Sequence, residues 1–161
     1  MSAPIRTFRP RRLRRPAEEV HRRLTAEPQA LVALATADAI SRSAPLMRRW
    51  GFTARTLPNV TAEASDEGEL GSVSIRWHGA EEITGWPTMT ARLLVTPTGP
   101  TGTELTLTST RAPALGLHAS ELSELHRVRA MDVLVDSFLR ALAGQVEHNS
   151  PLVLEPTGAR R

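Results

Sequence analysis

The sequence predicts an α+β fold in which antiparallel strands are covered on one face by a long C-terminal helix. Two observations predict it. Residues 59–111 alternate between apolar and polar side chains with the period of two that is typical of strands. Residues 120–146 repeat apolar side chains with the helical period, and no proline interrupts them before Pro151. The length of 161 residues suits one domain, which we expect over residues 1–148, followed by a C-terminal tail, residues 149–161.

The first third of the chain predicts one strand and two short helices. Residues 4–15 are expected to form a first strand with few apolar residues, and Pro10 makes a central place in the sheet unfavourable. Proline suits the first position of the helix predicted over residues 16–24. A second helix is expected over residues 28–40, and its resumption over residues 46–50 is left open.

Four strands are expected in the middle of the chain, over residues 59–64, 70–78, 88–96 and 103–111. Each of the last three places apolar side chains on one face and mostly polar side chains on the other, which suits an antiparallel sheet with one covered face. The side chains expected on the covered face are Val73, Ile75, Trp77, Met89, Ala91, Leu93, Leu105 and Leu107.

The long helix predicted over residues 120–146 is amphipathic, and Ser120 is placed to cap its first turn. Polar residues such as Arg129, Asp136 and Arg140 lie opposite the apolar stripe. The stripe consists of Val128, Met131, Val135, Phe138, Leu139, Leu142 and Val146. A helix with such a stripe requires a large apolar partner, and the predicted sheet is the candidate.

Composition excludes several kinds of chemistry. The chain contains no Cys, no Lys and no Tyr, which removes disulfides, thiolate nucleophiles, Schiff-base lysine and tyrosine acid catalysis. His118, Glu121, Glu124 and His126 are close in sequence, but their spacing does not converge on one ion, so no metal site is expected. We expect no catalytic residue and no cofactor.

Basic charge is concentrated at the front of the chain. Residues 1–60 contain twelve Arg and four acidic residues, whereas residues 61–161 contain eight Arg and thirteen acidic residues. The arginines of the first strand are interpreted as a solvated strand face, and a basic arm for nucleic acid or an anionic surface is the alternative. No apolar run is long enough for a transmembrane segment and no signal peptide is evident, so a cytoplasmic location is expected.

The order of these elements, together with the phrase RRLRRPAEEVHRRL, resembles the START-like (SRPBCC) superfamily of helix-grip domains, which includes polyketide cyclases and lipid-transfer domains. The matching residues are Pro16, Ala17 and Val20, which follow the first strand and start the first helix. The resemblance implies a curved antiparallel sheet wrapped around the long C-terminal helix, two short helices after the first strand, and a mostly apolar pocket between sheet and helix.

On this basis we expect a small hydrophobic ligand (lipid, polyketide or isoprenoid-like), no specific nucleic acid, and a monomer or homodimer. Whether the pocket is open or is a closed core is left open, as is a polyketide cyclase or aromatase activity assisted by Ser109 and Arg111. Arginine suits recognition of a carboxylate or carbonyl group. The expected ligand-binding residues are Trp77, Ile75, Met89, Leu93, Leu107, Ser109, Arg111, Met131, Val135 and Phe138.

Overall fold

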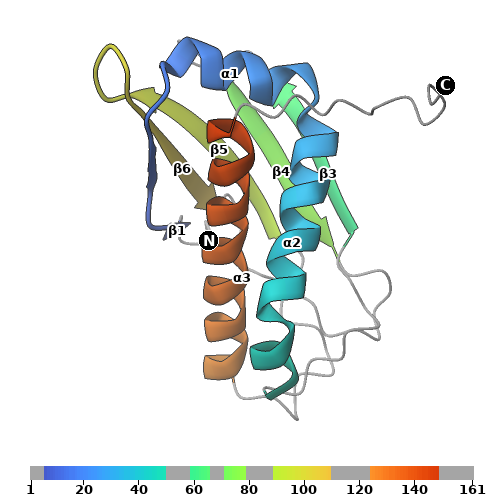
Figure 1. Cartoon of the computed structure of the whole chain (residues 1–161). Helices are drawn as coiled ribbons and strands as arrows, with labels where there is room; N and C mark the ends of the chain where they lie inside the picture. The colour runs from blue at the N-terminus through green and yellow to red at the C-terminus, as the bar shows by residue number, and fades with distance from the viewer. Residues whose placement is uncertain (1–5, 50–58, 66–70, 79–88, 110–123, 149–161) are drawn as a thin grey trace, which may run out of the picture.

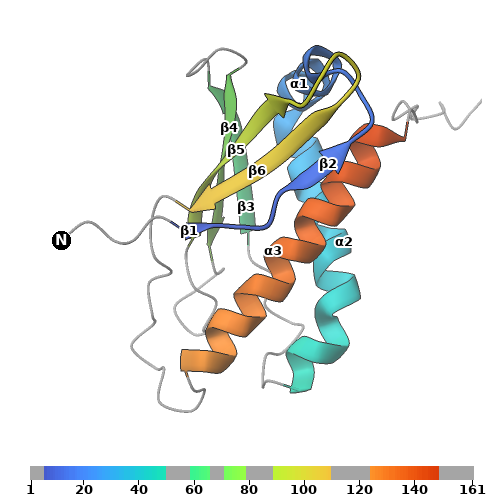
Figure 2. The same ribbon diagram turned by 90° about the vertical axis from the view of Figure 1, so that its left-hand side faces the viewer.

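A computed structural model describes residues 6–49, 59–65, 71–78, 89–109 and 124–148 of the chain. The fold has two layers: an antiparallel sheet on one side and two long antiparallel helices, α2 and α3, side by side on the other, with a short helix at one end (Figures 1 and 2). The elements in chain order are β1 (Arg6–Thr7), β2 (Arg11–Leu13), α1 (Ala17–Ala26), α2 (Pro28–Arg49), β3 (Asn59–Ser65), β4 (Ser72–His78), β5 (Met89–Pro97), β6 (Thr103–Ser109) and α3 (Glu124–Glu147).

The sheet has the order β1-β6-β5-β4-β3, and β2 also pairs with β6. The prediction of a single first strand over residues 4–15 is wrong. Two short strands flank Pro10, and between these strands the backbone N–H of Phe8 donates a hydrogen bond to the Leu107 carbonyl. Proline has no N–H to donate to a strand ladder, which explains the break. The expected edge position is confirmed, because β1 and β2 pair with β6 alone among the described strands.

Helix α2 is much longer than expected. It runs without a break for 22 residues and contains Pro45, whereas the sequence predicted a helix over residues 28–40 and left its resumption over residues 46–50 open. Proline removes one helical hydrogen bond, but the buried face of α2 continues from Val32 through Ala39 to Ser43 and packs beside α3. Tertiary burial therefore compensates for the lost bond.

The predicted alternation of the strands is confirmed. Along β5 and β6 every second residue is buried from Met89 to Val95 and from Thr103 to Ser109. The apolar stripe of α3 faces the same core, and its described members Val135, Phe138, Leu139, Leu142 and Val146 are all buried. Burial of each large side chain contributes about 1.5–3 kcal/mol, so these five stabilise the contact between α3 and the sheet substantially.

The C-terminal end of α3 is capped by arginines from the other end of the chain. The last turn of α3 contains no basic residue. Instead, Arg15 donates from Nε and Nη2 to the Glu147 carbonyl (3.3 and 3.0 Å), and Arg23 donates from Nη1 to the Val146 carbonyl (2.7 Å). Positive charge at a helix C-terminus satisfies free carbonyls and the helix dipole. Two of the N-terminal arginines are thus structural.

Gly71 is a position where only glycine fits. Its φ is +73°, and a Cβ there would lie 2.8 Å from the Ser65 carbonyl oxygen and 2.9 Å from His21 Nε2. Gly71→Ala is therefore expected to lower the free energy of unfolding by about 1–3 kcal/mol, as measured by urea denaturation. The matched control is Gly144→Ala within α3, where a Cβ meets nothing within 4 Å, and a gain of up to about 1 kcal/mol is expected. Equal effects of both variants would contradict this explanation.

Candidate functional site

Eight of the ten expected ligand-binding residues have described side chains, and all eight are buried between the sheet and the helices. Each is at most 3% exposed. They are Ile75, Trp77, Met89, Leu93, Leu107, Ser109, Val135 and Phe138. Met131 lies in α3 but its side chain is outside the described part, as is residue Arg111. The sequence therefore selected residues that share one face of the sheet and the facing side of α3.

Small side chains form one row across the inner face of the sheet. Ser109 is paired in register with Ala91, Ala91 with Ile75, and Ile75 with Ala62. Three of these four side chains are small, whereas Trp77 and Met89 form the next pair along the strands. The sheet therefore contributes least volume in this row, and the helical layer covers it, since its four residues are at most 7% exposed.

Trp77 is fixed from two sides beside this row. Its indole Nε1–H donates to Thr36 Oγ1 of α2 at 3.1 Å. Its ring meets the ring of Phe138 edge to face, with centroids 5.1 Å apart and planes at 87°. This geometry is favourable for aromatic pairs. Trp77 therefore connects the sheet to both long helices.

Buried hydroxyl groups from α2 complete the interior and were missed by the sequence analysis. Thr36 and Ser43 are each 3% exposed, and Ser43 Oγ donates to Ser137 Oγ of α3 at 3.2 Å. The available signal was their spacing of seven residues, which places both on the face of α2 that carries Val32 and Ala39. The interior is thus apolar with a few hydroxyl groups.

The arginines of the first strand are only partly a solvated face. Arg11 forms a 2.6 Å ion pair with Asp136 of α3, and Arg12, mostly exposed, lies 3.6 Å from Glu104. With Arg15 and Arg23 at the end of α3, three arginines hold that helix. Between residues 7 and 26, the guanidinium groups that have no ion pair within the described part of the chain are those of Arg9, Arg14 and Arg22.

The His and Glu residues that cluster before and at the start of α3 cannot be assigned to this site. His118 and Glu121 lie outside the described residues, as do the side chains of Glu124 and His126. Elsewhere in the chain, the residues with described placement include no group of three or more metal-ligating side chains. Within the same residues, no helix combines the length and apolar character needed to cross a bilayer.

No family model matches the chain, and no curated protein matches it. Solved structures with similar architecture include a START superfamily protein from Mycobacterium smegmatis, 12% identical with a TM-score of 0.49, covering 89% of this chain and 97% of that one. The ZhuI aromatase/cyclase from Streptomyces sp. R1128 is 14% identical with a TM-score of 0.43, covering 89% of this chain and 94% of that one. A protein from Thermus thermophilus is 15% identical with a TM-score of 0.42, covering 89% of this chain and 97% of that one.

The fold itself can be assigned from the elements described above. Two edge strands lead into two helices, four antiparallel strands follow in meander order, and a long C-terminal helix packs on the inner face. The second helix is longer than expected, but the order and topology agree with the prediction. The chain has an α+β fold with the helix-grip order of elements that the sequence predicted.

Proposed function

We propose that the domain binds a small hydrophobic molecule, such as a lipid, a polyketide or an isoprenoid, between the sheet and α3. The observation that carries this proposal is the row of small side chains formed by Ser109, Ala91 and Ala62 on the inner face. Beside it, Trp77 and Phe138 offer a large apolar wall. Ligand sites of this class combine an apolar lining with a few placed polar groups.

The polar groups come from both layers. The Ser109 hydroxyl is buried at the end of β6, and the hydroxyls of Thr36 and Ser43 are buried on α2. A ligand with a terminal hydroxyl or carbonyl group would find hydrogen-bonding partners here while its carbon skeleton contacts the apolar wall. Arg111 and Met131 belong to the proposed site by their positions in the sequence, two residues beyond Ser109 and on the stripe of α3.

Filling the proposed space from the sheet side is the direct test. Ala91→Leu adds bulk at the centre of the small row, where Ala91 is 1% exposed. If the row borders a ligand site, the variant should keep the wild-type free energy of unfolding within about 0.5 kcal/mol and lose bound ligand, because its side chain takes the ligand's place. If the row is closely packed core, the variant should lose about 1–3 kcal/mol through overpacking. The second result would contradict the proposal.

Ligand content is read by native mass spectrometry of the purified full chain and by uptake of a fluorescent fatty acid. We expect wild type to bind the probe and Ala91→Leu to bind it at least about tenfold more weakly, a change of about 1.4 kcal/mol. Leu94→Ala is the matched control, because Leu94 lies three residues along β5 and is 37% exposed. It should bind as wild type does. A wild-type chain that carries no ligand and takes up no probe would also overturn the proposal.

A further inference from the structure

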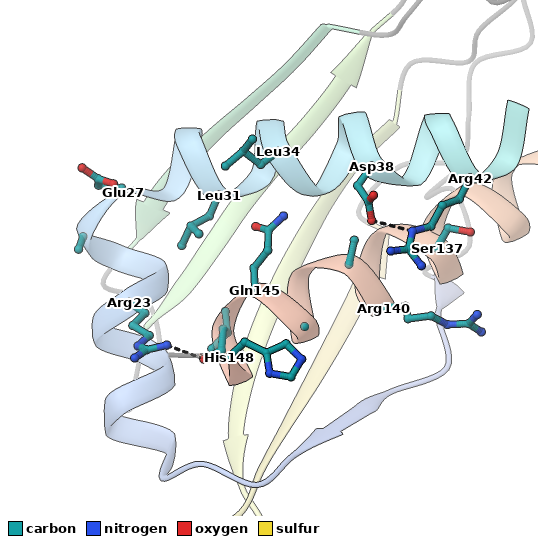
Figure 3. A pocket seen from close by; sticks show the side chains of 14 residues that line it. Arg23, Glu27, Leu31, Leu34, Asp38, Arg42, Ser137, Arg140, Gln145 and His148 are labelled. Carbon is teal, nitrogen blue, oxygen red and sulfur yellow. Dashed lines mark hydrogen bonds and ion pairs between the residues drawn. The ribbon is translucent and has the colours of Figure 1, made fainter. Parts of the chain in front are cut away.

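A groove opens on the outer side of the helical layer, at the corner where α1 and α2 meet the end of α3 (Figure 3). Its volume is about 1250 Å³. Leu31 and Leu34 of α2 line the groove (Figure 3), as do Ala141 and Gly144 of α3. The groove lies across the helices from the proposed ligand site, so the following inference does not depend on that proposal.

Two features indicate that the groove is shaped for an occupant. Leu34 is 45% exposed. Among the described residues, the other large apolar side chain with high exposure is Leu94, at 37%. Gly144 lies inside α3, where glycine is less favourable than alanine, and nothing lies within 4 Å of the position its Cβ would take. A glycine that lowers helix stability and a leucine exposed to solvent therefore lie along the same groove.

A third feature indicates what kind of occupant fits. Gln145 points from α3 toward α2 in the groove, and its side chain is partly exposed (Figure 3). A glutamine amide carries both a donor and an acceptor. The peptide groups of an extended segment can pair with such an amide, whereas an aliphatic chain cannot. The groove thus fits an apolar peptide segment.

We infer that the occupant is the chain's own segment 151–156, Pro-Leu-Val-Leu-Glu-Pro, which follows α3. His148, the last described residue before this segment, itself lines the groove. Six extended residues from His148 to Leu154 span about 20 Å. Along α2 the groove extends from Leu31 to Arg42, a length of about 17 Å, so the segment is long enough to reach its far end.

The chemistry of the segment complements the groove. Leu152, Val153 and Leu154 match the apolar walls, and the flanking prolines favour an extended backbone whose N–H groups remain free for Gln145. Glu155 would then arrive at the far end of the groove, where Arg42 and Arg140 are mostly exposed and keep unused donors. Because the segment is tethered, even weak contacts suffice to hold it in place.

Disulfide trapping in the full chain tests this inference. Because the chain contains no native Cys, only the introduced thiols can react. Leu34→Cys combined with Leu152→Cys should form an intramolecular disulfide under mild oxidation at least about tenfold faster than the control pair, because docking raises the effective thiol concentration. The control combines Leu94→Cys, on the sheet, with Leu152→Cys. Mass spectrometry and non-reducing electrophoresis distinguish the intramolecular disulfide from a cross-linked dimer.

Each other outcome overturns the inference. Equal rates for the two pairs would mean that the segment does not reside in the groove, and a cross-linked dimer through Leu34→Cys would assign the groove to a second copy. A third variant adds Gly144→Leu, which fills the groove at a position with free space. It should slow trapping to the rate of the control pair, and unchanged trapping would show that the segment binds elsewhere.

Discussion

Replacing Phe138 with alanine is expected to lower the free energy of unfolding by about 3–5 kcal/mol, among the largest effects available to one substitution in this chain. Phe138 is 1% exposed at the contact between α3 and the sheet, and its ring meets Trp77 edge to face. The variant loses buried apolar area, the aromatic contact, and support for the indole that donates to Thr36. Urea denaturation followed by tryptophan fluorescence measures the change.

Leu34→Ala is the matched control for Phe138→Ala, because it also removes a large apolar side chain from a long helix. Leu34 is 45% exposed, so its loss should cost less than about 1 kcal/mol even if a segment rests on it. Similar losses for the two variants would contradict the assignment of Phe138 to the centre of the core. Trp77→Ala should behave like Phe138→Ala, and the double variant should lose less than the sum, because the two residues touch.

Removing both arginines at the end of α3 is expected to cost about 2–3 kcal/mol of unfolding free energy. Hydrogen bonds to charged groups contribute more than neutral ones, but partial solvent exposure of both side chains, 28–29%, reduces the contribution of each. Arg15→Ala with Arg23→Ala leaves the Glu147 and Val146 carbonyls without these donors. Thermal and urea unfolding measure the loss.

The control for the arginine pair is Arg14→Ala with Arg22→Ala, which removes the same charge from the same region. Both side chains are exposed and their guanidinium groups have no ion pair within the described residues, so the change should stay within about 0.5 kcal/mol. Equal losses from the two double variants would mean that net charge, not the capping of α3, sets the effect. Such a result would favour the simpler view of these arginines as a solvated face.

Much of the fold was readable from the sequence because its signals are local. Alternation with a period of two places Val73, Ile75 and Trp77 on one face of a strand whatever the partner strand is. The 3.6-residue period does the same for Val135, Phe138 and Leu142 along α3. Eight expected site residues consequently fell on the buried inner faces, as the structure describes them.

Tertiary contacts decided what local signals could not. Pro45 removes one helical hydrogen bond, but the buried face that α2 presents to α3 keeps the helix continuous. From the sequence, Thr36 is one polar residue in an alanine-rich helix, but in the structure its hydroxyl oxygen accepts a hydrogen bond from Trp77, 41 positions away. From the sequence, Arg15 and Arg23 are interpreted as surface charge, but in the structure they donate hydrogen bonds to carbonyls of α3, 132 and 123 positions away.

The sequence by itself thus determined which face of each element is apolar, because periodicity acts within one element. Only the tertiary structure decided which polar groups are satisfied and where the outer groove lies, because hydrogen bonds and hollows depend on elements that the sequence does not place side by side.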